Sequence, residues 1–324
     1  METTFYFSKS AAEDTKDGTG NSTMSNLSAS DIGSGIIENL LGDVGAENDH
    51  CISCNTCRIE CPANIATSLL QPRKLVRMVS LGLLEELMRL PEIWYCLQCK
   101  KCNRICPMDV KPSLLIKHIR QEAIKHSIMD WETFVKYEAL GIQLQRVRWQ
   151  TVTHLIQNKK ISADLREWSK WAAQPIPQDH HPIQIIGMGQ RPRHEQQPIF
   201  PTNLTACVTC KECTAACPIA SELSVFDPLV IFRMANLGLR NELIVHPAIW
   251  LCIGCEACTT ACHQSVRGHM IIQDLKELAM KENRLPHDFE LQLETHQRAL
   301  YKRYQLEVDS LLKGRLKNYL AFCP

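Results

Sequence analysis

The chain has 324 residues, 45% of them hydrophobic, and a formal net charge of +1. This length is enough for two compact domains, and the balanced charge gives no reason to expect nucleic acid or an anionic membrane surface as a partner. No stretch approaches the roughly 18 uncharged apolar residues of a membrane span, and the first 45 residues lack the basic start and apolar run of a signal peptide. The 17 cysteines therefore favour metal-bound thiolates in a reducing cytoplasm over disulfides.

Residues 1–45 are predicted to form a flexible leader, because they are rich in Ser, Thr, Gly and Asp. Within them, the short apolar segment Ile36–Leu41 could dock a partner, or it could form a helical turn that packs on the chain's own first repeat. We favour the second interpretation as the simpler one.

Sixteen of the 17 cysteines fall into four quartets with one spacing, C-x2-C-x2-C-x3-C. The first quartet is Cys51, Cys54, Cys57 and Cys61; the second is Cys96, Cys99, Cys102 and Cys106; the third is Cys207, Cys210, Cys213 and Cys217; the fourth is Cys252, Cys255, Cys258 and Cys262. The first two quartets start 45 residues apart, as do the last two, and the second pair follows the first by 156 residues without a gap. The chain is therefore an internal duplication.

The duplication predicts a first module over residues 46–171 and a second over residues 202–324. The segment between them, residues 172–201, is rich in proline and polar residues and is predicted to be a linker.

Helical signals fill the space between and after the quartets. Asp227 followed by Pro228 is typical of an N-cap and a first helical residue. Gly82 and its repeat, Gly238, are expected to end a first short helix, with a second short helix following each. Further helices are predicted over residues 112–126, 130–158, 270–283 and 288–320, where apolar residues recur at helical spacing. Strand signals are almost absent, so the predicted fold is mostly α.

The spacing within each quartet distinguishes between two kinds of metal site. Structural zinc sites usually combine two pairs of Cys or His ligands that a longer loop separates. The compact run of four cysteines seen here is instead associated with 4Fe-4S clusters. In two-cluster ferredoxins the fourth cysteine of each run ligates the other cluster. This rule predicts four ligand sets: Cys51, Cys54, Cys57 and Cys106; Cys96, Cys99, Cys102 and Cys61; Cys207, Cys210, Cys213 and Cys262; Cys252, Cys255, Cys258 and Cys217.

The fourth quartet ends in Cys262–His263, where the other three end in Cys-Pro. This is not a haem attachment site, because three residues rather than two separate the last cysteines. Histidine restores a backbone N–H that proline lacks, and such a donor beside the cluster could raise its reduction potential. The alternative, which we favour, is that the loop tolerates a different residue.

Several other residues recur in both halves. Arg77 and Arg233 could offset the negative charge of thiolate-bound clusters, or they could be surface ion-pair partners. Trp94 and Trp250 precede a quartet by two residues and are expected to bury the cluster and exclude water, with a partner contact as the alternative. Cys323 belongs to no quartet and is interpreted as a spare thiol.

The quartets differ in charge. Lys100, Lys101 and Arg104 make the second quartet basic, whereas Glu256 makes the fourth acidic or neutral. We expect the two ends to dock different partners and the basic end to have the higher potential.

The motifs "PRKLVRMVSLG" and "PEIWYCLQCKKCNRICP", with their counterparts in the second half, resemble the small iron–sulfur subunit of heterodisulfide reductases. The resemblance covers residues 45–130 and 200–285, and it implies two tandem α-helical ferredoxin modules, each wrapping two 4Fe-4S clusters. The chain departs from that family in joining two such modules, in having His263 in place of proline, and in its acidic, serine-rich leader.

Members of that family relay electrons between a flavin-containing subunit and a catalytic subunit, which often carries a cysteine-rich CCG motif. This sequence has no CCG and no flavin or nucleotide motif. The resemblance therefore implies a non-catalytic electron-transfer subunit with four 4Fe-4S clusters, whose partners are other chains of a redox complex. We expect it in the cytoplasm, with membrane association only through partner subunits.

The alternative within the same chemistry is the iron–sulfur subunit of a quinone-linked respiratory dehydrogenase or reductase with a separate membrane anchor. From different classes, the CxxC pairs could serve a thiol–disulfide enzyme, or the cysteines could hold zinc in a purely structural scaffold. Iron and zinc content would distinguish these alternatives.

Overall fold

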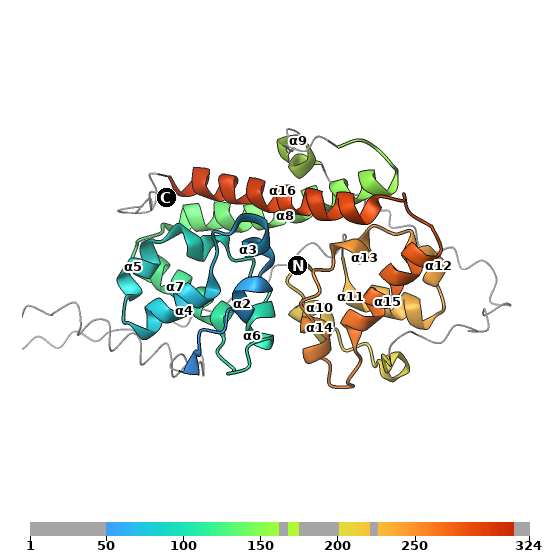
Figure 1. The fold of residues 1–324 in the computed structure, drawn as a ribbon, viewed down its shortest axis with the longest axis horizontal. Coiled ribbons are helices and arrows are strands. Elements are labelled where there is room, and N and C mark those ends of the chain that lie inside the picture. Colours follow the sequence, from blue (N-terminus) through green and yellow to red (C-terminus); the bar gives the residue numbers. More distant parts are fainter. Residues whose placement is uncertain (1–49, 162–167, 175–200, 221–225, 314–324) are drawn as a thin grey trace, which may run out of the picture.

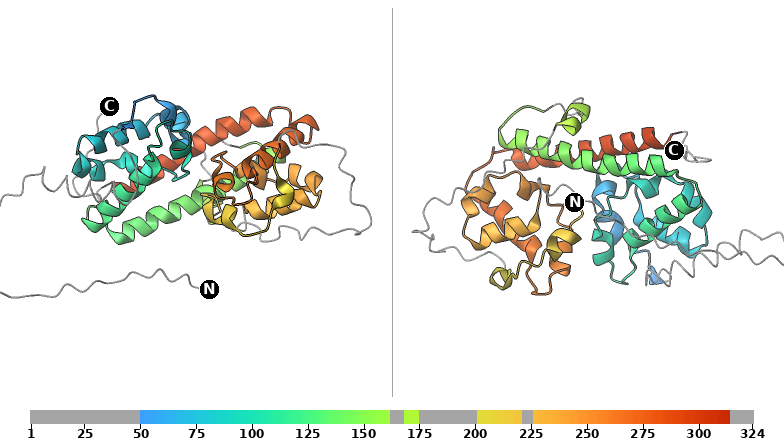
Figure 2. Two further views of the ribbon diagram at one scale, coloured as in Figure 1. Left: turned by 90° about the horizontal axis from the view of Figure 1, so that it is seen from below. Right: turned by 180° about the vertical axis from the view of Figure 1, so that it is seen from behind.

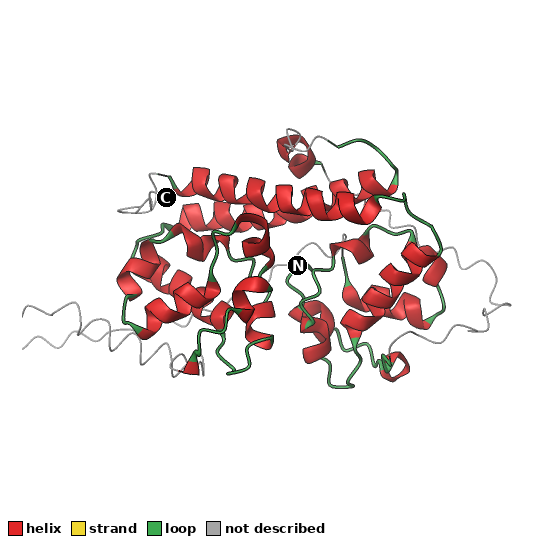
Figure 3. Cartoon of the chain, viewed as in Figure 1, coloured by secondary structure: helices red, strands yellow, loops and turns green. Residues whose placement is uncertain are grey.

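A computed structural model describes residues 50–161, 168–174, 201–220 and 226–313. Every regular element in these ranges is a helix (Figure 3), which confirms the prediction of a mostly α fold. The predicted leader, the segment Ile36–Leu41, most of the linker and Cys323 lie outside the described residues.

Most helices of the first module recur in the second, 156 residues later. The first contains α2 (Thr56–Ile59), α3 (Pro62–Thr67), α4 (Pro72–Ser80), α5 (Leu84–Arg89), the 3-10 helix η2 (Pro91–Tyr95), α6 (Lys101–Arg104) and α7 (Pro112–Lys125). The second contains the 3-10 helix η3 (Leu204–Ala206), α10 (Glu212–Ala216), α11 (Pro228–Asn236), α12 (Arg240–Ile244), α13 (Ala248–Leu251), α14 (Ala257–Thr260) and α15 (Gly268–Lys281). Three more helices complete the described fold: α8 (Trp131–Ile156), α9 (Trp168–Ala173) and α16 (Phe289–Leu312).

The first helix of each insert starts as predicted. Pro228 opens α11, and the Asp227 side chain accepts a hydrogen bond of 2.9 Å from the Leu229 N–H. Pro72 opens α4 in the same way, although Gln71 provides no side-chain cap. Proline suits the first helical position because its fixed φ is helical and no intrahelical partner is lost.

The same helices end at the predicted glycines. Gly82 has a φ of 75°, and the next N–H, that of Leu83, reaches back to the Met78 carbonyl at 3.0 Å. Gly238 repeats this arrangement with a φ of 83°. This is the Schellman geometry, in which a left-handed residue directs the chain away from the helix axis while satisfying its last carbonyls. Each insert therefore folds into two short helices joined at a sharp corner.

Two long antiparallel helices join the modules. In the views of Figures 1 and 2, α8 and α16 lie side by side across both modules. Helix α8 starts over the first module, where Leu144 and Val147 belong to its core, and ends over the second, where Val152 and Leu155 belong to the other core.

Helix α16 runs in the opposite direction. Its first turns place Phe289 in the second core, and its later turns place Leu300 and Val308 in the first core. Polar contacts accompany this exchange: Tyr95 of η2 donates to Asp309 at 2.5 Å, and Gln305 donates to Thr67 of α3 at 2.7 Å. In return, Arg148 of α8 donates to the Leu251 carbonyl of α13 at 2.7 Å. Each module therefore completes its core with a helix from the other half of the sequence.

Within the described residues, no helix is both long enough and apolar enough to cross a membrane.

The exchange of α16 predicts that a core residue of the second repeat stabilises the first module. Leu300 is 1% exposed and packs in the first core, so Leu300→Ala should cost about 2–5 kcal/mol and lower the hydrogen-exchange protection of amides in α3 and η2. Leu306→Ala on the same helix is the control, because Leu306 is 61% exposed and its loss should cost no more than about 0.5 kcal/mol. Loss of protection confined to the second module would contradict the exchange.

Candidate metal centres

Each quartet is a loop that turns twice through left-handed backbone before entering a short helix. The left-handed positions are the residue before the second cysteine and the residue after it: Ser53 and Asn55, Gln98 and Lys100, Thr209 and Lys211, Gly254 and Glu256. Only one of these eight is glycine, so the loops hold ordinary residues in a conformation that they adopt at a cost of about 1–3 kcal/mol each. Successive residues of this kind turn backbone N–H groups toward a common concavity, an arrangement found around phosphates and iron–sulfur clusters.

In the second quartet the hydrogen bonding of this loop is explicit. The Gln98 N–H donates to Cys96 Sγ at 3.4 Å. A backbone donor held against a cysteine sulfur stabilises the thiolate form that binds metal.

The first cavity lies beside the first quartet. It is lined by Cys51, Cys54 and Cys57 of that quartet and by Cys106, the last cysteine of the second. Arg73 of α4 also lines it and donates to the Ser53 carbonyl at 3.1 Å. The last cysteine of the first quartet is absent from this lining.

The second cavity takes its cysteines in the reciprocal way. It is lined by Cys96, Cys99 and Cys102 of the second quartet together with Cys61 of the first. Ile116 of α7 closes one wall with its apolar side chain. The two ends of the first module therefore meet at both cavities.

The second module repeats both arrangements. A third cavity is lined by Cys207, Cys210 and Cys213 together with Cys262, and Cys258 also borders it. The fourth group is Cys217, Cys252, Cys255 and Cys258, whose charges act on one another. The groups that the structure assembles coincide with the four ligand sets expected from the exchange rule. Which cysteines ligate which cluster stays a prediction, because it can be tested only with cysteine variants.

Burial favours the protonated form of several of these thiols when no metal is bound. It raises the pKa of Cys57 to about 11 and that of Cys61, Cys99 and Cys217 to about 12, with neighbouring cysteines adding to the rise. A thiolate, rather than a thiol, is the ligand, so metal binding must displace these protons.

The donor set fits an iron–sulfur cluster. Four sulfur ligands surrounding a cavity between two loops are what a 4Fe-4S cube requires. Among the residues that the structure describes, no three His, Cys, Asp or Glu side chains converge closely enough to hold a single metal ion.

One cation per module lies behind the second cysteine loop, buried in the first module and half-buried in the second. Arg120 of α7 is 6% exposed and donates to the carbonyls of Ile93 at 2.8 Å and Cys96 at 2.6 Å. Lys276 of α15, its equivalent after the 156-residue shift, donates to the Cys252 carbonyl at 3.1 Å. Both sites were missed in the sequence analysis, because an isolated basic residue in an amphipathic helix carries no signal of burial.

Each of these cations also faces the tryptophan of its module. The Arg120 guanidinium lies 5.5 Å from the ring centre of Trp94, and the Lys276 ammonium lies 5.5 Å from that of Trp250. A cation over an indole face is stabilised by the ring's negative potential. Trp94 and Trp250 are 0% and 4% exposed, so they belong to the cores behind the cysteines and are inaccessible to a partner.

The remaining predicted residues do not line the three cavities. Arg77 and Arg233 are exposed on α4 and α11, and the cations placed against the cysteines are other residues. His263 is exposed, and the turn after its cysteine, with Ser265 N–H donating to Cys262 O at 3.1 Å, matches the proline-containing turn after Cys106. The equal turns show that the loop accepts either residue, and a tuning role for His263 stays a prediction.

The charges of the second and fourth quartets do not mark opposite ends of the molecule. Arg104 forms an ion pair of 2.9 Å with Glu256, so the basic loop of one module faces the acidic loop of the other. Each loop satisfies part of the other's charge, so the charges of these two loops do not support the expectation that they dock different partners, and that expectation stays a prediction.

Comparison with known proteins supports an iron–sulfur assignment. Residues 47–111 and residues 203–266 each match a family model described as a 4Fe-4S dicluster domain. An 80-residue part of the chain, 25% of its length, is 35% identical to 40% of a subunit of the H(2):CoB-CoM heterodisulfide,ferredoxin reductase of Methanothermobacter thermautotrophicus.

Two further relatives give similar values. The iron–sulfur subunit of the CoB–CoM heterodisulfide reductase of Methanopyrus kandleri is 35% identical over 80 residues, which cover 25% of this chain and 41% of that protein. A protein of Archaeoglobus profundus that is named as similar to a heterodisulfide reductase subunit is 32% identical over 79 residues, which cover 24% of this chain and 42% of that protein. The chain thus spans about two fifths of the length of these curated relatives. No solved structure gave a significant match. The predicted resemblance to the heterodisulfide reductase subunit is confirmed over this part of the chain.

The ligand exchange predicts which pairs of cysteine variants are redundant. Cys51 and Cys106 line the same cavity, so the double variant Cys51→Ala/Cys106→Ala should lose one cluster, leaving about twelve irons of about sixteen. Cys96→Ala/Cys106→Ala removes ligands from two cavities and should leave about eight. Iron content after anaerobic reconstitution measures the difference, and Cys323→Ala, outside the quartets, should keep all the iron. Equal losses in the two double variants would refute the exchange.

Proposed function

We propose that this chain is the electron-transfer subunit of a heterodisulfide reductase-like complex and that it carries four 4Fe-4S clusters. The observation that carries the proposal is the assembly of sixteen cysteines into four groups of four, two in each dicluster domain. The relatives support it through their names, since each is named as a subunit of a heterodisulfide reductase or as similar to one.

When bound, a 4Fe-4S cluster supplies a centre that gains and loses one electron. The residues of this chain then set the position, the solvent access and the potential of each centre. No residue of the chain is assigned a step that forms or breaks a covalent bond in a substrate.

The cysteine groups differ in solvent access in a way that suits a relay. Cys54 of the first quartet and Cys210 of the third are exposed, whereas Cys99 and Cys255 of the second and fourth are buried. An exposed cluster ligand brings the centre within reach of a partner protein, and a buried one keeps water away.

An exposed apolar residue lies two positions before each exposed ligand. Ile52 is 62% exposed next to the first quartet, and its repeat, Val208, is 60% exposed next to the third. Exposed apolar side chains beside a redox centre favour contact with another protein. We assign these two loops to contacts with the partner subunits, a flavin-containing subunit at one and a catalytic subunit at the other.

The buried cations stabilise added negative charge. Reduction makes a thiolate-bound cluster more negative, and Arg120 lies against the Cys96 loop with its charge out of water. Lys276 has the same place in the second module. Each raises the potential of the centre beside it, because a charge at short range in a poorly solvated site acts with little screening.

The composition of the native complex tests the proposal. A tagged chain, purified without oxygen at native expression, should bring with it a flavin-containing subunit and a subunit with a CCG motif. The brown protein should contain about sixteen irons per chain and reduce reversibly by single electrons. Quinone-site membrane subunits in place of those partners would favour the respiratory alternative, and zinc in place of iron would exclude both.

Removal of one buried charge should lower one potential. Arg120→Gln should lower the reduction potential of the centre at Cys96, Cys99, Cys102 and Cys61 by an amount equivalent to on the order of 1–2 kcal/mol per electron, because an uncompensated positive charge is lost. Redox titration followed by electron paramagnetic resonance measures this shift. Arg120→Lys keeps the charge and should restore most of the potential, and Arg77→Gln, an exposed arginine of the same module, should leave all potentials within error. An equal shift in Arg77→Gln would show that the effect is not specific to the buried site.

A further inference from the structure

The relation between the two modules determines whether they act as one relay. Equivalent positions of the two halves face each other: α8 pairs with α16, and the loop of the second quartet faces that of the fourth. The first and third quartets carry the exposed cysteines, Cys54 and Cys210. Two of the four cysteine groups, those of the second and fourth quartets, therefore lie where the two modules meet, and we call this place the junction.

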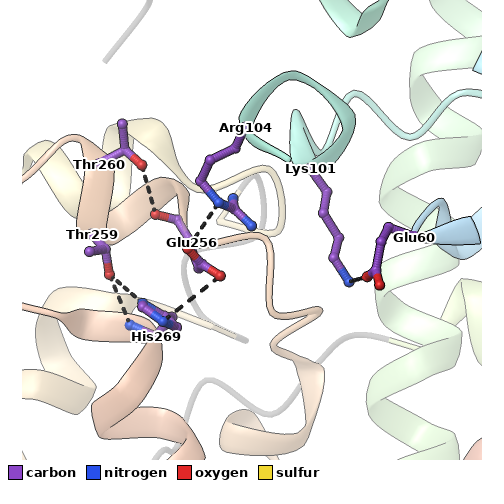
Figure 4. Close-up of polar contacts among 7 residues, drawn as sticks. All are labelled: Glu60, Lys101, Arg104, Glu256, Thr259, Thr260 and His269. Atoms are coloured by element: carbon purple, nitrogen blue, oxygen red, sulfur yellow. Dashed lines mark hydrogen bonds and ion pairs between the residues drawn. The ribbon is translucent and has the colours of Figure 1, made fainter. Parts of the chain in front are cut away.

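The contact across the junction is made by residues of the cysteine loops themselves. Arg104 follows Cys102 by two residues, and Glu256 follows Cys255 directly. Their ion pair of 2.9 Å joins α6 to the start of α14, with side chains only 23% and 37% exposed (Figure 4). The ion pair therefore links one cysteine loop directly to the other.

The acidic member of this pair also lies near a histidine of its own module. His269 Nε2 of α15 lies 3.9 Å from Glu256, and His269 Nδ1 shares a hydrogen bond of 2.7 Å with Thr259 Oγ1 (Figure 4). On the other side, Lys101 pairs with Glu60 at 2.7 Å within the first module. Arg104 is thus the residue of this group that crosses between the modules.

The cysteines behind the ion pair are buried on both sides of it. Tyr301 of α16, from the second repeat, is 6% exposed and packs in the core of the first module. Cys99 is 8% exposed and Cys255 is 7% exposed, so both side chains are largely shielded from water.

We propose that electrons cross between the modules directly from the ligand set of Cys61, Cys96, Cys99 and Cys102 to that of Cys217, Cys252, Cys255 and Cys258, with the Arg104–Glu256 ion pair holding the two loops together. The four centres then follow the spatial order first, second, fourth, third, which differs from their order in the sequence. This inference rests on the proposed function, since it requires all four clusters. One electron moves in each transfer, so that one centre is oxidised as the other is reduced, and no covalent bond changes.

Removal of the two outer centres isolates the junction. The double variant Cys54→Ala/Cys210→Ala changes only exposed ligands and should retain about eight irons, one cluster in each module. After reduction with dithionite, the two remaining centres should interact magnetically, seen as broadened electron paramagnetic resonance signals that need several-fold more microwave power to saturate than an isolated cluster. The converse variant, Cys99→Ala/Cys255→Ala, leaves the outer centres, whose signals should be narrow and uncoupled.

The ion pair is then tested in the variant that keeps the inner centres. Arg104→Glu places two carboxylates at the junction and should weaken the magnetic interaction, while the exchange Arg104→Glu/Glu256→Arg should restore it. Lys74→Glu is the matched control, because it reverses a cation that pairs with Glu92 at 3.1 Å inside the first module and should leave the interaction unchanged.

The results separate this inference from the proposed function. Iron far below eight in Cys54→Ala/Cys210→Ala, together with iron far below sixteen in the unaltered chain, would count against the four-cluster proposal. If Cys54→Ala/Cys210→Ala retains its expected iron but its two centres give paramagnetic resonance signals without magnetic interaction, the direct transfer across the junction is overturned. The proposal of four clusters would still stand. Coupled signals in Cys99→Ala/Cys255→Ala would overturn it as well, because the modules would then meet at their outer centres.

Discussion

The central constraint of this fold is that each cavity of the first module draws three cysteines from one quartet and the fourth from the other quartet, which starts 45 residues away. Cys61 and Cys106 each line the cavity beside the other quartet, so neither cavity of the first module forms until both ends of the module meet. The short helices α4 and α5, with the corner at Gly82, set the span between those ends. Metal binding to such sites is coupled to folding, because the binding free energy is gained only when distant loops converge.

A second constraint ties the two modules together. The antiparallel pair α8 and α16 contributes Val152 to the second core and Val308 to the first, so neither helix can leave its partner module without exposing apolar surface. Tyr95 and Asp309 add a hydrogen bond of 2.5 Å between the repeats. Electron transfer slows steeply with distance. The helix pair holds the cysteine groups of the second and fourth quartets at one junction, which two independently moving modules would not do.

Electrostatics acts at two depths in this arrangement. Arg120 and Lys276 lie behind the cysteine loops, where burial and an aromatic face strengthen their effect. Arg104 and Glu256 lie between the loops and are partly solvated, so their pair contributes positioning more than stability. Basic side chains therefore serve two purposes here, charge stabilisation behind the loops and positioning between them. Burial and neighbouring residues, rather than residue type, determine which purpose each one serves.

The sequence determined the local features, because these depend on residues close to one another in the chain. Cysteine spacing indicated iron–sulfur chemistry, Asp227–Pro228 placed the start of α11, and Gly82 placed the end of α4. The tertiary structure alone decided that α16 completes the first core, that Arg120 is buried against Cys96 O, and that Arg104 meets Glu256. Each of these features joins segments from the two ends of a module or from both repeats. The periodicity of apolar residues cannot specify them, because an apolar helix face indicates that the helix packs but does not identify the element it packs against. The charged loops at Arg104 and Glu256 illustrate this: their charges could be read in the sequence, but only the packing of α8 against α16 brings them together.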